Sequence, residues 1–375
     1  MTLNPHVRRY LPLAVFAAAL ALALPSLQPL PAPQLQSVVA TPTAVANTGM
    51  ERRFLVNPAA SAHSASLADL GDSKIAAAWF AGSREGAADV NIVFATFDGK
   101  DWNAPKAIMT REQVQRDTRR VVRKLGNPVL WRDAGGRLHL WFVSVAYGGW
   151  AGSALNHAQS DDGGAHWSPA RRLITSPFLN ISTLVRGSPL PLADGGVALP
   201  VYHEFIAKRP EWLRFDANGK IVDKRRFPAS ARLLQATAAA IDERNILALM
   251  RDAGPKRRIH AARSADSGAS WTPAEATALP NPNAGIALLR LADGRLLLAS
   301  NPAEGGRNLL ALQVSSDQGQ TWSPPQFIER GADEDEYSYP ILLQDETSMI
   351  HLAYTWKRQT IAHLRFAPAA LEVAK

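Results

Sequence analysis

The chain has 375 residues and no cysteine, and its 41 basic and 33 acidic residues give a formal net charge of +8. The absence of cysteine excludes disulfides, a thiol nucleophile and cysteine-ligated zinc. The net charge favours acidic partners such as anionic glycans, and no run of Lys and Arg is dense enough to predict binding to nucleic acid. A hydrophobic fraction of 46% with 20% charged residues is typical of a globular body with an ample core.

The first 50 residues differ in composition from the rest of the chain. Arg8 and Arg9 precede an apolar run, residues 11–24, and a proline-rich stretch follows. A basic flank before a short apolar run is typical of a signal peptide or an uncleaved signal anchor, and the run is shorter than the ~20 residues of a full membrane span. We therefore assign residues 1–50 to a signal or anchor segment with a linker. We therefore expect the protein to be exported, either to the periplasm or to the membrane surface, where residues 11–24 would anchor it.

From Glu51 onwards, two apolar strands, a polar strand and a turn repeat along the chain, and no long amphipathic helix is expected. Turns with Asp-Gly, Gly-Gly or similar residues separate the first two strands of each unit. The six predicted strand pairs are Ser64–Leu70 with Lys74–Phe80, Pro128–Arg132 with Arg137–Val143, Pro189–Leu192 with Gly196–Tyr202, Ala236–Ile241 with Ile246–Met250, Ile286–Leu291 with Arg295–Ser300, and Pro340–Gln344 with Met349–Tyr354.

A second repeat, Ser-x-Asp-x-Gly-x-x-Trp, occurs in several of the same units. Asp accepts hydrogen bonds from nearby backbone N–H groups, Gly supplies positive φ, and Trp packs on the sheet. These residues are therefore expected to stabilise hairpin turns away from any site. Full copies lie at Ser160–Pro169, Ser264–Pro273 and Ser315–Pro324, and a weaker copy lies at Asp98–Pro105.

The spacing of these copies predicts the architecture. Trp271 and Trp322 are 51 residues apart, and the 104 residues from Trp167 to Trp271 leave room for one more unit. The turn at residues 215–219 is its degenerate copy. A period near 50 with hairpin turns indicates a propeller of four-stranded blades.

We predict an all-β fold, a six-bladed β-propeller formed by residues 51–375 as one domain. The sixth unit ends with the third strand, Thr360–Phe366, and has no fourth strand behind it. Glu51–Val56 is expected to supply that strand and to close the ring, which removes an exposed sheet edge.

Loops that lead into first strands and out of second strands of a propeller meet on one face, around the axis. In this chain the residues at these loop positions are mostly polar. A packed core would be apolar, so the polar residues predict a binding or catalytic site on this face. The residues before the first strands are His63, Asn127, Arg186, Gln235, Asn283 and Tyr337. Those after the second strands are Arg84, Glu85, Ser144, Tyr147, His203, Glu204, Arg251, Asp252, Asn301, Trp356 and Arg358.

The repeats, the six blades and this polar ring resemble the bacterial sialidase (neuraminidase) superfamily, in particular its predicted-sialidase branch. The resemblance covers about residues 60–366. Sialidases of this kind hold a carboxylate with three arginines and use a Tyr nucleophile paired with a Glu, together with an Asp acid. The resemblance implies Arg251 and Arg307 as two of the arginines. It also implies Tyr337, which opens the last blade in a Tyr-Ser pair, as the nucleophile.

Three positions depart from that pattern. His63 stands in place of the first arginine, Thr355 in place of the Glu that supports it, and Gln235 in place of the Glu that pairs with the nucleophile. A Gln cannot take a proton from a Tyr, and a His is charged only part of the time near neutral pH. The sequence therefore predicts a rebuilt site, with Glu85 as the acid and Glu204 as an activating base.

The first hypothesis is an exported glycoside hydrolase that acts on a terminal, acidic or otherwise polar sugar. Two alternatives stay open: a non-catalytic glycan-binding propeller, and a polysaccharide lyase with Tyr337 and His203 as acid and base. The partner is a glycan, the chain is expected to be a monomer, and no cofactor is predicted. Calcium held by loop carboxylates stays open, and the acidic run Glu334–Glu336 is interpreted as a solvated loop. The expected substrate-binding residues are His63, Arg84, Asn127, Arg186, His203, Arg251, Asn283, Arg307, Trp356 and Arg358.

Overall fold

The computed structural model describes residues 5–23, 32–36, 49–176 and 180–371, and the chain divides into two compact units. The first unit, Met1–Ala32, contains the helix α1 (Pro5–Ala23), which covers most of the apolar run. No helix among the described residues is long and apolar enough to cross a membrane. Most of the predicted linker lies outside the described residues.

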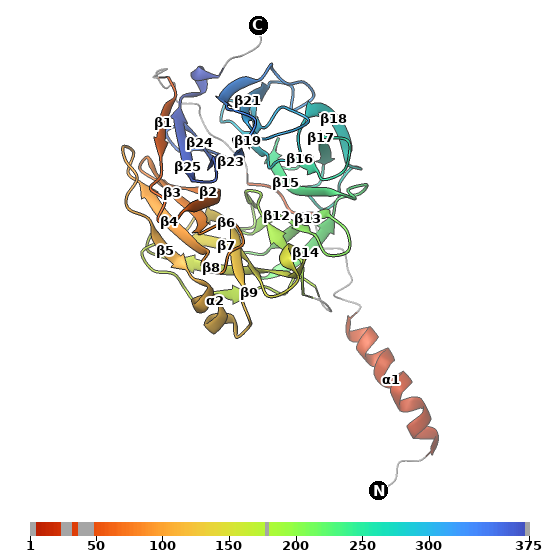
Figure 1. The fold of residues 1–375 in the computed structure, drawn as a ribbon. Coiled ribbons are helices and arrows are strands. Elements are labelled where there is room, and N and C mark those ends of the chain that lie inside the picture. The colour runs from red at the N-terminus through yellow and green to blue at the C-terminus, as the bar shows by residue number, and fades with distance from the viewer. Residues whose placement is uncertain (1–4, 24–31, 37–48, 177–179, 372–375) are drawn as a thin grey trace. The chain divides into compact units, whose positions relative to one another are not determined.

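The second unit, Pro33–Lys375, is built around six antiparallel sheets in its described residues, and the sheets surround one axis as blades (Figure 1). Blade 1 contains β2 (Ser61–Gly71), β3 (Lys74–Gly82), β4 (Asn91–Phe97) and β5 (Lys106–Met109). Blade 2 contains β6 (Lys124–Arg132), β7 (Leu138–Val145), β8 (Ser153–Ser160) and β9 (Arg171–Arg172). Blade 3 contains β10 (Leu184–Val185), β11 (Leu190–Pro191), β12 (Val197–His203), β13 (Arg209–Phe215) and β14 (Ile221–Arg226).

The remaining blades have four strands each. Blade 4 contains β15 (Leu233–Ala240), β16 (Ile246–Asp252), β17 (Arg258–Ser264) and β18 (Glu275–Pro280). Blade 5 contains β19 (Ala287–Arg290), β20 (Leu296–Ser300), β21 (Leu309–Ser315) and β22 (Gln326–Arg330). Blade 6 contains β23 (Tyr337–Gln344), β24 (Ile350–Trp356), β25 (Thr360–Phe366) and β1 (Glu51–Phe54). Short helical segments are α2 (Arg111–Thr118), η2 (Gly149–Gly152) and η3 (Pro368–Ala370).

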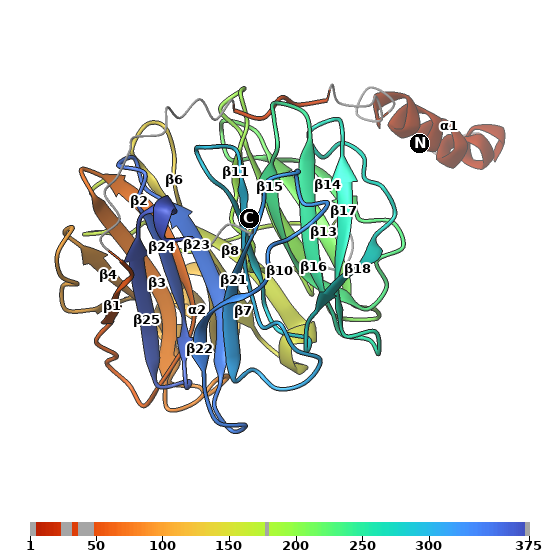
Figure 2. The same cartoon turned by 90° about the horizontal axis from the view of Figure 1, so that it is seen from above.

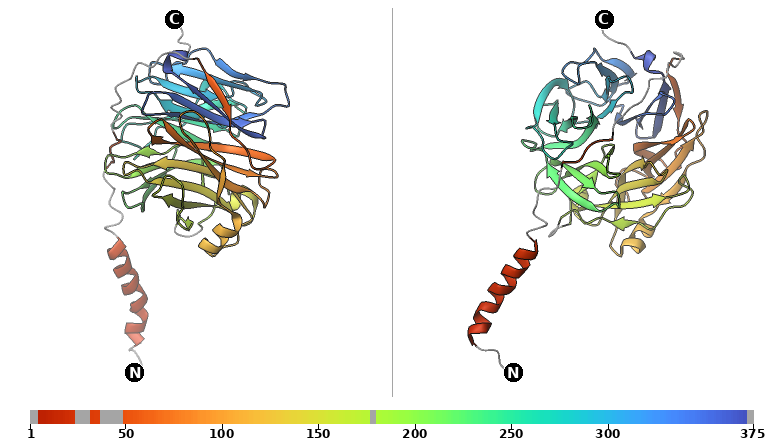
Figure 3. Two further views of the ribbon diagram at one scale, coloured as in Figure 1. Left: turned by 90° about the vertical axis from the view of Figure 1, so that its left-hand side faces the viewer. Right: turned by 180° about the vertical axis from the view of Figure 1, so that it is seen from behind.

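Blade 6 joins the two ends of the propeller, as the sequence predicted. The strand order is β1-β25-β24-β23, and β1 runs antiparallel to β25 from Glu51 opposite Arg365 to Phe54 opposite Ala362. Figure 2 shows β1 beside β25 with the blades seen edge-on, and Figure 3 shows the same ring from behind. The six-bladed, all-β prediction is confirmed.

The Ser-x-Asp-x-Gly-x-x-Trp turns also form as predicted. The Ser315 hydroxyl donates to Asp317 Oδ1 (2.7 Å) and accepts from the N–H of Gly319 (2.8 Å). Asp317 also accepts from backbone N–H groups further along the turn. The hydrogen bond from the Thr321 hydroxyl, together with these backbone and serine contacts, lowers the pKa of Asp317. The same serine contacts recur at Ser160 with Asp162 and at Ser264 with Asp266.

The tryptophan of each turn packs on the preceding blade. The ring of Trp167 lies edge-on to Phe94 of blade 1, with centroids 5.8 Å apart. The ring of Trp271 lies edge-on to Trp212 of blade 3 at 5.1 Å. The turns therefore join neighbouring blades, and their recurring residues serve hydrogen bonding within the turn and packing between blades.

Two features of the propeller differ from the sequence prediction. The helix α2 was not expected; Thr110 caps it by accepting from the N–H of Gln113. Residues 33–36, assigned to the linker, pair with blade turns: the Leu35 N–H donates to Glu243 O (2.8 Å), and the Leu35 side chain is 1% exposed. The compact unit thus begins before Glu51.

Candidate active site

Four of the first strands bend at one residue near the axis. Ser64 in β2, Asn127 in β6, Gln235 in β15 and Tyr339 in β23 all have positive φ, between 47° and 55°. Each lies where the register between the first and second strands of its blade shifts. Such bulges change the direction of the side chains. Side chains from several blades contact one another at this end of the axis.

Tyr339 is at the centre of these contacts. The guanidinium carbons of Arg186, Arg307 and Arg251 lie 5.6, 5.7 and 6.0 Å from the centroid of its ring. The ring of His63 approaches it edge-on at 4.7 Å. Three guanidinium groups gathered around one ring favour a negatively charged ligand at this place.

Arg186 mainly holds the site together. Its Nη2 donates to the carbonyls of Tyr339 (2.7 Å) and Pro340 (3.0 Å), which ties blade 3 to blade 6. Burial lowers the pKa of Arg186 to about 10, so the side chain stays charged at neutral pH.

Arg251 is different, because its Nε and Nη1 are buried and have no hydrogen-bond partner among the described residues. The residue is 8% exposed. A buried guanidinium without an anion is costly, and its planar fork matches a carboxylate. Arg251 thus has two nitrogens left to donate to a ligand, and Arg186 Nε is likewise buried without a partner among the described residues.

Arg307 is held by the protein on two sides. Its Nη1 pairs with Glu336 Oε1 (3.2 Å), and its Nη2 donates to the carbonyl of Asn283 (3.1 Å). Glu336 also accepts from the Ser338 hydroxyl (2.6 Å) and from Arg358 Nε (2.7 Å). Burial alone would raise the pKa of Glu336, but these partners lower it, so the carboxylate is charged. Glu336 is therefore part of the site, although its acidic run was interpreted as a solvated loop.

Glu85 lies on the other side of His63. Its Oε2 is 3.5 Å from His63 Nε2 and 3.8 Å from Arg358 Nη1, and its side chain is 30% exposed. The contact with His63 is too long to fix the imidazole, whose ring nitrogens are buried without a hydrogen bond. Burial lowers the pKa of His63 to about 3, so His63 is neutral at neutral pH and does not replace an arginine charge.

A second polar cluster surrounds Tyr202, which sequence reasoning did not select. Its hydroxyl accepts from Asn127 Nδ2 and from Gln235 Nε2, each at 3.0 Å. Burial, and next the charge of Glu204, raise the pKa of Tyr202. A hydroxyl that accepts two N–H groups keeps its own proton to donate. The available signal was its position directly before the polar pair His203-Glu204.

Tyr337 does not reach the arginines. It is 4% exposed, its ring lies edge-on to Tyr354 at 6.5 Å, and its hydroxyl donates to Asp335 Oδ2 (3.3 Å). Asn301 Nδ2 donates to its carbonyl (2.8 Å). Tyr337 thus belongs to the core of blades 5 and 6, and Tyr339 takes the central position because β23 has a bulge after Ser338.

The other predicted residues frame the site. Arg84 is exposed beside Glu85. His203 ends β12 on blade 3 and Glu204 follows it; both are half-buried. Trp356 packs edge-on against Phe54 of β1, with centroids 5.2 Å apart.

Thr355 does not take over the chemistry of a glutamate. Its hydroxyl accepts from the N–H of Ser64 (3.0 Å), so it fixes the bulge of β2 beside His63. Thr355 and His63, which both differ from the sialidase pattern, therefore act on the same strand: His63 lies in β2, and Thr355 binds the backbone of β2. Among the described residues, no group of three or more His, Asp or Glu side chains is placed to hold a metal ion.

The described strands form a six-bladed β-propeller, and solved sialidase structures share this fold. Residues 73–352 match the family described as BNR repeat-like domain, and because this match spans most of the chain, the chain belongs to that family. No curated protein sequence matches the chain.

Solved structures share the fold at low identity. The Hadza microbial sialidase Hz136 superposes with a TM-score of 0.70 at 17% identity, over 84% of this chain and 67% of that one. The K499G mutant of NanB sialidase from Streptococcus pneumoniae gives 0.67 at 11% identity, over 88% and 72%. The intramolecular trans-sialidase from Ruminococcus gnavus gives 0.67 at 15% identity, over 89% and 100%. At identities this low, the comparisons establish the fold, and any activity has to be argued from the residues of the candidate site.

Proposed function

We propose that this chain is an exported glycoside hydrolase of the sialidase type that acts on a terminal acidic sugar of a glycan. The observation that carries the proposal is Arg251, a buried guanidinium with two N–H groups unpaired among the described residues, beside the ring of Tyr339. A sugar carboxylate would pair with these donors. Arg307, positioned by Glu336, would add a second cation.

The proposed chemistry uses a tyrosine with carboxyl groups, as glycosidases with a Tyr nucleophile do. Tyr339 would attack or stabilise the anomeric carbon, because its ring lies among the three guanidinium groups that would surround the sugar carboxylate. Glu85, partly exposed, would protonate the leaving oxygen. Tyr202 would donate a hydrogen bond to a sugar hydroxyl, with Glu204 nearby as the activating base.

The substrate is expected to differ from an ordinary sialic acid. Arg186 Nη2 donates to two backbone carbonyls and His63 is neutral, so Arg251, with Nε and Nη1 both unpaired among the described residues, is the main donor of the cluster to a carboxylate. Losing one partner of a buried charged contact typically costs ~3–5 kcal/mol, or roughly two to three orders of magnitude in rate at ~1.4 kcal/mol per decade. Weak or absent hydrolysis of a generic aryl sialoside follows.

A second candidate is glycan binding without cleavage. It is favoured by Gln235, whose side-chain amide hydrogen-bonds to the Tyr202 hydroxyl. An amide cannot act as the general base that a nucleophilic tyrosine needs. No contact supports the lyase alternative, since Tyr337 is packed in blades 5 and 6 and His203 ends a strand of blade 3.

The test is to assay the purified chain against an aryl sialoside and a panel of glycans with terminal acidic sugars. New reducing ends report hydrolysis, ultraviolet absorbance reports a lyase, and calorimetry reports binding. We expect hydrolysis of one panel glycan that Tyr339→Phe and Arg251→Met abolish and that the matched control Tyr337→Phe retains. Efficient turnover of the aryl sialoside would identify an ordinary sialidase. Binding with no new product would establish the second candidate.

Export is part of the same proposal and has its own test. The basic residues Arg8 and Arg9, which lie in α1 ahead of the apolar run 11–24, support it. Fractionation of cells that express the full chain should recover the protein outside the cytoplasm. Deletion of residues 1–32 should retain it inside.

A further inference from the structure

The densest basic stretch of the chain comprises α2 and the loop that follows it. Residues 111–124 contain six basic and two acidic side chains, so this stretch carries half of the net charge of +8. Both acidic side chains already have partners: Glu112 pairs with Arg111 (2.6 Å), and Asp117 accepts from the N–H of Ala170 (2.8 Å). The other cations of the stretch are therefore not balanced by its own carboxylates.

Three arginines of this stretch are available to a partner. Arg119, Arg120 and Arg123 are exposed, and their side chains make no ion pair or hydrogen bond among the described residues. Their backbone is nevertheless fixed. Arg119 caps the C-terminus of α2 with a φ of 52°, and the N–H of Arg123 donates to Val145 O (2.8 Å). The three guanidinium groups thus extend into solvent from an ordered loop.

A fourth arginine, Arg172 of β9, lies near them. Burial, and next the charge of Arg120, lower the pKa of Arg172, so two like charges are close to one another. Arg172 Nη2 donates to the carbonyl of Asn180 (2.5 Å), and its Nε is buried without a partner among the described residues. Neither arginine has a carboxylate partner among the described residues, so an anion bound between them would relieve their repulsion.

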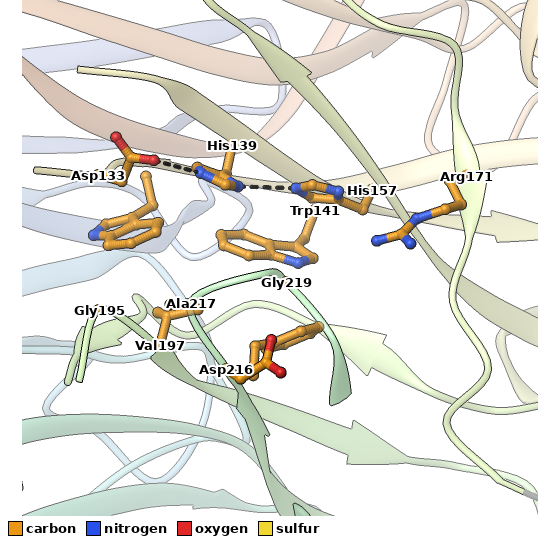
Figure 4. Close-up of a pocket in the computed structure, with 12 residues that line it drawn as sticks. Asp133, His139, Trp141, His157, Arg171, Gly195, Val197, Asp216, Ala217 and Gly219 are labelled. Carbon is orange, nitrogen blue, oxygen red and sulfur yellow. Dashed lines mark hydrogen bonds and ion pairs between the residues drawn. The ribbon is translucent and has the colours of Figure 1, made fainter. Parts of the chain in front are cut away.

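The other arginine of β9 lies elsewhere. Side chains alternate across a strand, and Figure 4 shows Arg171 beside His157 at the small cavity between blades 2 and 3. The helix α2 lies beside β9 (Figure 1), and the hydrogen bond from Ala170 to Asp117 joins the two. The basic patch is therefore formed by Arg119, Arg120, Arg123 and Arg172.

The basic patch leads to the candidate active site through Lys124. This residue directly follows Arg123 and opens β6, on the face of the propeller that holds the site. An added Cβ at Gly86 would lie 3.4 Å from Lys124 Nζ. The charge of Glu85 also acts on Lys124: burial lowers the pKa of this lysine, and Glu85 opposes that shift. Lys124 therefore connects the basic patch with Glu85, the proposed acid.

We propose that the basic patch binds a glycan made of several acidic sugars, of which the terminal one enters the candidate active site. This inference rests on the proposed hydrolase function, because Glu85 protonates the leaving oxygen there and the rest of the glycan begins beside it. Lys124 comes next, and the backbone from Lys124 to Arg119 spans at most ~18 Å, which is farther than a single sugar ring reaches. Successive sugar carboxylates would pair with the exposed guanidinium groups.

The experiment measures binding of polygalacturonate, which has a carboxylate on every sugar, to the full chain by calorimetry. The native protein should bind it, more weakly as the salt concentration rises, and should not bind neutral dextran. The triple variant Arg119→Gln, Arg120→Gln, Arg123→Gln should bind about tenfold more weakly, the equivalent of ~1.4 kcal/mol, and should depend less on salt. If the triple variant melts early, Arg120→Glu, which inverts one exposed charge, provides the comparison.

A matched control removes the same amount of charge from exposed turns elsewhere in the propeller. It should bind polygalacturonate as the native protein does; its substitutions are Lys74→Gln, Lys220→Gln and Arg244→Gln. Turnover gives a separate readout. For the acidic sugar that the glycan panel identifies, the triple variant should raise KM on a long glycan and leave KM on a disaccharide unchanged, because the shorter substrate does not reach the patch.

The possible outcomes distinguish this inference from the hydrolase proposal. Undiminished binding by the folded triple variant, or no binding by the native protein, would overturn the inference whatever the activity. Tighter binding of DNA or of phosphatidylglycerol vesicles than of polygalacturonate through the same arginines would also overturn it, and would assign the patch to a nucleic acid or a membrane surface. Binding through the patch with no new reducing ends would support the patch and reject the hydrolase.

Discussion

Arg251 and Arg186 belong to one cluster, and replacing each by Met should change stability in opposite directions. Arg251 has two buried N–H groups with no partner among the described residues, whereas Arg186 donates to two backbone carbonyls. Met keeps most of the length and apolar surface of an arginine side chain. The substitutions therefore isolate what the two guanidinium groups contribute.

The magnitudes follow from these contacts. A buried polar group left unpaired costs ~1–3 kcal/mol, and the contact of Arg251 with the Tyr339 ring returns ~0.5–1 kcal/mol, so Arg251→Met should stabilise the chain by ~1–2 kcal/mol. Arg186→Met removes charged hydrogen bonds and leaves two carbonyls unpaired, a loss of ~2–4 kcal/mol. For a unit of about 340 residues, unfolding entropy is ~0.7 kcal/mol per degree. The shifts in melting temperature are then roughly +1.5 to +3 °C and −3 to −6 °C.

Calorimetric melting of the native chain and of both variants, without ligand, measures these shifts. Affinity for the acidic sugar identified by the glycan panel should fall by about a hundredfold in Arg251→Met. The reasoning is wrong if Arg251→Met melts as low as Arg186→Met. That outcome would mean that Arg251 is paired in solution and supports the fold instead of awaiting a ligand.

Three further predictions concern stability, pH and the position of the central tyrosine. Trp271→Ala should lower the free energy of unfolding by ~3–5 kcal/mol without changing glycan affinity, because Trp271 is buried between blades; an unchanged melting temperature would contradict its packing role. Hydrogen bonds from Thr321 lower the pKa of Asp317 in the folded chain. Its stabilisation should therefore be complete above about pH 4 and be lost as the pH falls below that value. Acid titration should show a shallower loss in Asp317→Asn, and equal slopes would refute this role. Gly285→Ala should displace the ring of Tyr339 and reduce turnover several-fold with little loss of stability, since an added Cβ would lie 2.9 Å from Tyr339 Cδ1. Unchanged turnover would show that Tyr339 is not central.

The fold could be predicted because its signals are local. A turn such as Ser315–Pro324 specifies its own hydrogen bonds within a few residues, so repeated turns reveal the number of blades. The segment 33–36 could not be placed in the same way. Leu35 is buried by partners such as Glu243, more than 200 residues further along the chain. The short helix α2 also escaped prediction, because eight residues show little more than one amphipathic repeat.

The location of the site could be predicted, but not which residues of its strands point into it. Loop positions alone brought Arg251, Gln235 and Asn127 to one end of the axis. The choice between Tyr337 and Tyr339 depends on a bulge that no alternation of apolar and polar residues reveals. Glu336 looked like part of an exposed acidic run because the two arginines that contact it, Arg307 and Arg358, come from different loops.

The closing pair of strands also has a consequence for how fast this protein forms. Glu51 and Arg365 are partners in β1 and β25, so the 313 residues between them must be made before the two strands can pair. Closing a loop of that length costs about 5 kcal/mol of chain entropy, and contacts this distant in sequence slow folding. Until the last blade exists, β1 has no strand to pair with, and the first and last blades expose open edges. The ring should therefore complete in a late, slow step, during which a half-built propeller is most prone to pair with a neighbour.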